Sequence, residues 1–130
     1  MPLACGQQDI YFLHSVLEVC LYYAPVGSGG SVLFENVELI LRYFSQIRSL
    51  LARKMIICKL FAHLGIYPDH EQFNFHALLL LKTPVDKIEV IDLQLIVESI
   101  LDQWVMWSIQ CCPQGKWLKV LPLLLKSDAP

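Results

Sequence analysis

Apolar residues recur at helical spacing through most of this chain, and one stretch is apolar on nearly every side. Between residues 47 and 64 the sequence IRSLLARKMIICKLFAHL contains no Gly or Pro that would break a helix. Gly65 follows where a left-handed cap is needed, and Pro68 cannot prolong a helix. Because a helix that is apolar all round is usually buried, the pattern predicts a central helix around which the other elements pack.

Two further helices are predicted before the central one. The first covers residues 9–23, with Asp9 at its N-terminal end, and Pro25 and the VGSGGS run then form a connection. Its buried stripe is predicted to be Ile10, Leu13, Leu17, Cys20 and Leu21. Ser31 is a suitable N-cap for the second helix, which is predicted to end near residues 45–49. Its buried side is predicted to be Leu33, Val37, Ile40, Leu41 and Phe44. One continuous helix over residues 32–64 is the alternative, but it would be unusually long.

Beyond Pro68 the pattern becomes irregular over residues 70–91. The LLLL run there fits a short buried helix or a strand, and Thr83-Pro84 indicates a turn. Asp92 can cap a further helix to about residue 109, with a solvated face of Gln94, Glu98 and Asp102. The buried stripe of that helix is predicted to be Leu93, Val97, Ile100, Trp104 and Trp107.

The last helix is predicted over residues 118–126, after Pro113-Gln114-Gly115, with Pro122 in its first turns. The expected fold class is therefore all-α: a compact orthogonal bundle of about five helices with an irregular segment at about 70–91. A chain of 130 residues supports a single domain, which we expect to span residues 1–130.

Composition narrows the possible environments. The chain is 55% hydrophobic and only 17% charged, which indicates either a dense helical core or an apolar surface meant for a partner. The charge-free stretches are too short or too broken by glycine to predict a membrane span, and no basic region precedes an apolar segment as it does in a signal peptide. The formal net charge of −2 disfavours strong nucleic-acid binding, although half of the ten basic residues lie between Arg42 and Lys59.

The five cysteines are expected to be reduced thiols in a cytosolic protein. They are Cys5, Cys20, Cys58, Cys111 and Cys112, an odd number at spacings that match no zinc pattern. We expect no metal and no other cofactor, since His70 and His76 alone would make a poor zinc site.

The cations of the central helix suggest a binding groove. Arg48, Lys59 and His63 are predicted to share one stripe, and Lys54 falls inside the main apolar face. Because a lone buried ammonium is costly, Lys54 is expected to reach solvent along its aliphatic stem or to border a groove. An apolar groove with a cationic rim is the geometry that holds an acidic or amphipathic peptide.

No catalytic arrangement stands out, so we expect a protein that is not an enzyme. Cys58 and His63 are five residues apart on a helix, which separates their directions by about 140°. The GSGG run lacks the strand before it and the lysine after it that a phosphate-binding loop needs. The aromatic side chains are predicted to be core rather than a base-stacking platform, and they are Tyr11, Trp104, Trp107 and Trp117.

Two segments of the chain form a familiar pair: HLGIYPD, residues 63–69, at the end of the central helix, and GKWLKVLPLL, residues 115–124. Together they resemble the C-terminal helical domain of the RecO family of bacterial recombination-repair proteins. They resemble the family's Leu-Gly-x-x-Pro-Asp helix end and its Gly-Lys-x-Leu-Lys turn into a last helix. The chain lacks the oligonucleotide-binding barrel that usually precedes this domain, and HEQFNFHALL stands where many members carry a cysteine zinc cluster.

The resemblance implies a mediator of DNA repair and recombination. Such proteins help to load recombinase onto single-stranded DNA, associate with RecR, and bind the acidic, phenylalanine-ending tail of the single-stranded-DNA-binding protein through the helical domain. By that analogy the tail would contact Arg48, Arg53, Lys54, Lys59, Leu60, Phe61, Lys116 and Lys119. The alternative is a helical adaptor or self-associating domain unrelated to repair.

Overall fold

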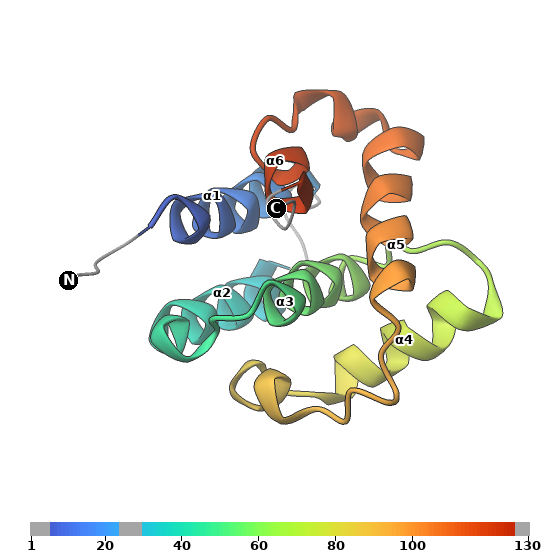
Figure 1. The fold of residues 1–130 in the computed structure, drawn as a ribbon. Helices are drawn as coiled ribbons and strands as arrows, with labels where there is room; N and C mark the ends of the chain where they lie inside the picture. The colour runs from blue at the N-terminus through green and yellow to red at the C-terminus, as the bar shows by residue number, and fades with distance from the viewer. Residues whose placement is uncertain (1–5, 24–29, 127–130) are drawn as a thin grey trace.

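A computed structural model describes residues 6–23 and 30–126, and within these ranges every regular element is helical (Figure 1). The α-helices are α1 (Gln7–Tyr23), α2 (Gly30–Arg42), α3 (Leu50–His63), α4 (Glu71–Lys82), α5 (Glu98–Cys111) and α6 (Leu121–Lys126). Short 3-10 helices lie between them: η1 (Phe44–Gln46), η2 (Val85–Val90) and η3 (Pro113–Trp117). The predicted all-α class is confirmed.

Helix α3 is the centre of the fold, as the sequence predicts. It contacts α1, α2, α4 and α5, and every residue from 52 to 62 is buried. Figure 1 shows α5 running across α3 while α1 and α2 follow its length. Ser49 caps the helix by accepting a hydrogen bond from the Ala52 amide at 3.0 Å, so α3 begins at Leu50 and not at residue 47. Gly65 adopts the predicted left-handed conformation, with φ of 74°.

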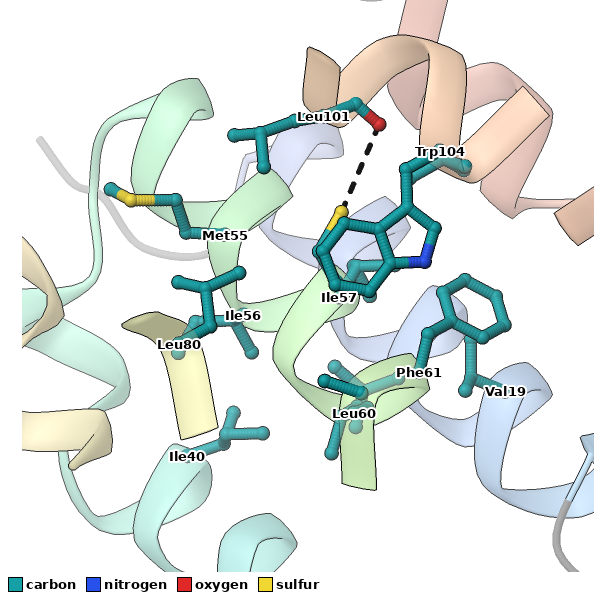
Figure 2. Packing of buried hydrophobic residues seen from close by; sticks show 14 of the residues in the cluster. Val19, Ile40, Met55, Ile56, Ile57, Leu60, Phe61, Leu80, Leu101 and Trp104 are labelled. Carbon is teal, nitrogen blue, oxygen red and sulfur yellow. Dashed lines mark hydrogen bonds between the residues drawn. The ribbon is translucent and has the colours of Figure 1, made fainter. Parts of the chain in front are cut away.

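The core forms around α3, where α1, α2, α4 and α5 meet it (Figure 2). Phe61 packs edge-on against Tyr23 with ring centroids 5.0 Å apart, and the Tyr23 hydroxyl donates to the Ser108 carbonyl at 2.8 Å. Trp104 is fully buried and donates its indole N–H to the Ile66 carbonyl at 2.8 Å. That bond attaches the loop after Gly65 to α5, which supports the turn at the end of α3.

The predicted buried stripe of α1 is wrong. Phe12, Val16, Val19 and Tyr23 face the core. Ile10, Leu17 and Leu21 of the predicted stripe are 45%, 59% and 71% exposed, while Leu13 and Cys20 are half-buried. The helix is apolar on both sides, and the larger aromatic side chains of the other side fill the space beside α3.

The second helix differs from its prediction in smaller ways. Helix α2 begins at Gly30, so Ser31 lies within its first turn and not at the cap. Leu33 and Ile40 are buried as predicted, but Leu41 is 60% exposed. A break at residues 43–49, which contains η1, separates α2 from α3, and this excludes a continuous helix over residues 32–64. The connection predicted around Pro25 lies outside the described residues.

The segment at 70–91 is more regular than predicted, because most of it forms α4 and η2, and of the two structures left open for the LLLL run it is the helix that forms. His70 caps α4 by accepting a hydrogen bond from the Gln72 amide at 3.3 Å, and the LLLL run is helical. The irregular part comes later: the helix predicted from Asp92 begins at Glu98. Asp92 instead accepts from the Gln94 amide at 2.9 Å, closing a local turn.

The predicted buried stripe of the fifth helix is correct only from its third member onward. Leu93 and Val97 precede the helix and are 61% and 49% exposed. Ile100 and Trp104 are buried, and Trp107 is half-buried.

Helix α6 brings the last part of the described chain next to the first helix. It begins at Leu121, later than predicted, and packs against α1. The Glu18 carboxylate of α1 accepts hydrogen bonds from the backbone amides of Lys119, Val120 and Leu121 at 2.9 to 3.1 Å. The Leu121 amide is at the start of α6 and the other two directly precede it, so the carboxylate lies at the N-terminal end of the helix, where a negative charge is well placed.

Candidate partner-binding site

Arg53, predicted to be on a groove rim, is buried and its charge is matched inside the fold. The side chain is 5% exposed and forms an ion pair with Asp9 of α1. Its Nε donates to the Ile47 carbonyl at 3.1 Å, and the guanidinium lies 5.2 Å from the ring centre of Phe12. The hydrogen bond from Arg53 holds the pKa of Asp9 below its usual range. Arg53 therefore ties α1 to α3 and presents little surface to a partner.

Lys54 neither reaches solvent nor borders an open groove, so both expectations for it are wrong. Its side chain is 1% exposed, and Nζ lies 2.8 Å from Glu98 Oε2 and 2.9 Å from Asp102 Oδ1 of α5. Burial alone would lower the pKa of Lys54, but the contacts with the two carboxylates outweigh it and leave the pKa raised. Glu98 and Asp102, predicted to be a solvated face, thus supply the charge that Lys54 needs.

Lys59 is buried with much weaker compensation. It is 4% exposed and donates to the Leu80 carbonyl of α4 at 2.8 Å. Burial lowers its pKa to about 8. His63 is next to it, and burial together with the Lys59 charge lowers the pKa of His63 as well. The predicted neighbours Leu60 and Phe61 are fully buried core residues.

The remaining predicted cations are exposed, and of these only Arg48 lies near one of the buried three, since both it and Arg53 act on Asp9. Arg48 precedes α3, so it does not share a stripe with Lys59 and His63, and its backbone amide donates to Glu89 Oε1 at 3.1 Å. Lys116 and Lys119 lie on the segment between α5 and α6. The structure therefore does not bring the eight predicted residues together into one surface.

Trp117 was predicted to be core, and that prediction is wrong. Its side chain is 55% exposed, and Lys116 Nζ lies 5.2 Å from the ring centre. The neighbouring Gly115 explains the arrangement: an added Cβ would lie 1.7 Å from the Ile109 carbonyl oxygen, so the backbone is pressed against α5. The short helix η3 buries its glycine side and turns Lys116 and Trp117 outward. The order Gly115-Lys116-Trp117 was the feature of the sequence from which this exposed pair could have been predicted.

The cysteines and possible metal ligands give no second site in the part of the chain that is described. Cys20, Cys58, Cys111 and Cys112 are free thiols, and Cys5 lies outside the described residues. Burial raises the pKa of the Cys20 thiol to about 11, which makes it a poor nucleophile. In residues 6–23 and 30–126, no three His, Cys, Asp or Glu side chains gather to hold a metal ion.

Comparison with known proteins returns no match: no family model, curated protein or solved structure resembles this chain significantly. Membership of the RecO family therefore stays a prediction. Among the described residues, no helix is long and apolar enough to cross a membrane.

Proposed function

We propose that this protein is a non-enzymatic mediator module that binds the acidic tail of a partner protein through the segment around Lys116, Trp117 and Lys119. The observation that carries the proposal is the exposed Trp117 ring with the Lys116 ammonium beside it. This segment is also one of the two that resemble the RecO helical domain. The cations of α3 are excluded from the proposed contact because Arg53, Lys54 and Lys59 are buried.

The chemistry of the surface fits a tail that combines carboxylates with a terminal aromatic residue. Lys116 and Lys119 can attract the carboxylates, and a phenyl ring can pack on the exposed face of Trp117. By resemblance, the tail would be that of the single-stranded-DNA-binding protein, with RecR as a second partner and DNA repair and recombination as the process. We place this work in the cytoplasm, in keeping with free thiols at every described cysteine.

A fluorescence anisotropy titration tests the proposal directly. The labelled peptide carries several aspartates and ends in Phe, and a peptide of the same composition with an internal Phe serves as its control. We expect Lys116→Glu and Trp117→Ala each to weaken binding by at least about fivefold, and added salt to weaken it further. Lys87→Glu is the matched control, because Lys87 is an exposed lysine on another 3-10 helix. Equal binding of both peptides, or equal loss in the Lys87 variant, would contradict the proposal.

A second candidate function is a self-associating adaptor unrelated to repair. It is favoured by the exposed apolar side of α1, where Leu17 and Leu21 are 59% and 71% exposed. Contiguous apolar surface of this kind marks interaction sites on soluble domains.

A further inference from the structure

Helix α1 carries a second apolar surface directly opposite its core side. Ile10, His14, Leu17 and Leu21 follow one another at intervals of four, three and four residues, and all four are exposed. At about 100° per residue they lie roughly 180° around the helix from Phe12, Val16 and Val19. We call these four residues the outer strip. Half-buried Leu13 widens it on one side.

The charged residues of α1 itself are both engaged within the fold. The sequence of α1 contains two charged residues, Asp9 and Glu18. Asp9 is paired with Arg53, and the Glu18 carboxylate binds the backbone amides at the start of α6. A charged partner would therefore find no available opposite charge on α1.

The exposed apolar face of α2 is different. Phe34 and Leu41 on α2 are 73% and 60% exposed, but Glu38 stands between them on the same side and pairs with Arg42. Such a mixed face suits a partner with charges of its own. The outer strip is suited instead to a surface as apolar as itself.

We infer that the outer strip is a dimer interface in which α1 packs against α1 of a second copy of this chain, antiparallel, across a two-fold axis. The spacing of four, three and four is the one with which two helices interlock side chains along a seam. About an axis between His14 and Leu17, Ile10 of one copy meets Leu21 of the other, and His14 meets Leu17. Every contact then pairs residues of the strip with each other, as an isologous interface requires. This inference deepens the second candidate function and does not depend on the tail-binding proposal.

The area of the outer strip indicates how tightly the two copies can bind. Four exposed side chains with the edge of Leu13 would bury roughly 400–500 Å² per copy, or about 900 Å² in total, near the lower limit for a specific interface. We therefore expect a reversible dimer with a dissociation constant on the order of micromolar. The antiparallel arrangement also opposes the two helix dipoles favourably.

Sedimentation velocity of the full chain over a wide concentration range tests the interface. We expect the sedimentation coefficient to rise from monomer to dimer with concentration. Leu17→Glu should keep the protein monomeric throughout, because it places a carboxylate at the centre of the seam. Leu78→Glu is the matched control, since Leu78 on α4 is 58% exposed, almost the same as Leu17. His14→Leu should tighten the dimer by roughly tenfold or more, since it makes the seam fully aliphatic.

A charge pair tests the antiparallel register. Ile10→Glu alone and Leu21→Lys alone should each weaken the dimer, and the double variant should recover much of the loss, because the introduced charges meet across the two-fold axis. In a parallel pair, like charges would meet and the double variant would be worst.

Three outcomes would overturn the inference: a chain that stays monomeric at all concentrations, equal loss in the Leu78 and Leu17 variants, or no recovery in the double variant. Circular dichroism of each variant confirms that it is folded. Peptide binding that persists in Leu17→Glu separates a failure of this interface from a failure of the tail site.

Discussion

Lys54 and Lys59 lie five residues apart on α3 and both are buried, yet their surroundings shift their pKa values in opposite directions. Lys54 faces α5 and meets Glu98 and Asp102. Lys59 faces α4 and donates to a single backbone carbonyl. Accordingly, the pKa of Lys54 is raised and that of Lys59 is lowered to about 8.

The difference shows that the cost of burying a charge depends on what the neighbouring helix offers. The ammonium of Lys54 contacts two carboxylates, which favour its charged form. The ammonium of Lys59 contacts a backbone carbonyl, which compensates less for the cost of removing the charge from water. The α3–α5 junction should therefore depend on its lysine, and the α3–α4 junction should tolerate the loss of its own.

The largest effect is expected at the α3–α5 junction. Lys54→Met should lower the free energy of unfolding by about 2 kcal/mol at pH 7, because Glu98 and Asp102 lose the cation between them. The loss stays below that of a fully buried pair since both carboxylates are nearly half exposed. Urea denaturation measures it, with Lys82→Met on the exposed surface of α4 as control. Equal stability of Lys54→Met and Lys82→Met would contradict the proposed importance of Lys54 at the α3–α5 junction.

The opposite sign is expected at the α3–α4 junction. Lys59→Met should raise the free energy of unfolding by about 1 kcal/mol at pH 7, because methionine fills the same space without a charge to desolvate. The Leu80 carbonyl keeps a partner, since it also accepts from the Thr83 amide at 3.2 Å. The same urea titration checks this, and a clear loss of stability would show that the hydrogen bond of Lys59 outweighs its desolvation.

Stability against pH sharpens the comparison further. The pKa of Lys59 is lower in the folded state than in the unfolded chain, so the unfolded chain binds more protons between about pH 8 and pH 10.5. The wild-type protein should therefore gain stability over that window relative to Lys59→Met. The pKa of Lys54 is raised, so its contribution is complete below the ordinary value and is lost only as pH rises through the folded value. The deficit of Lys54→Met should persist at pH 10, which urea titrations at pH 7 and 10 can show.

The smallest effect is expected from removing one carboxylate. Glu98→Gln should cost about 0.5 kcal/mol at pH 7, because Asp102 remains within 2.9 Å of Lys54 and water reaches both acidic side chains. A thermal melt at low and high salt measures it. A cost as large as that of Lys54→Met would mean that the two carboxylates do not share the lysine.

The sequence predicts α3 well because its signals are local. Gly65 marks its C-terminal end, and a run that is apolar on all sides has to be buried wherever the other helices lie, whereas the Ser49 cap at its start was not predicted. The start of α5 failed for a related reason. Asp92 can accept a hydrogen bond in a turn as well as at a helix end, and the turn is what forms.

The faces of α1 and the pairing of the α3 cations are less accessible to sequence reasoning. Both sides of α1 are apolar, so periodicity cannot choose between Leu17 and Val16, and the shape of the space beside α3 decides. Lys54 and Glu98 are 44 residues apart in the chain, and only the docking of α5 brings them together. The sequence therefore identified the cations of α3 correctly as unusual positions but predicted the wrong surroundings for them.

The bonds from Glu18 to the start of α6 also set an order of events during synthesis. Their partners are separated by 101 to 103 residues, so α1 can complete its packing only after the residues of α6 have been synthesised. Until then the side of α1 that α6 covers stays exposed to solvent, together with Ile10, Leu17 and Leu21 on its outer side.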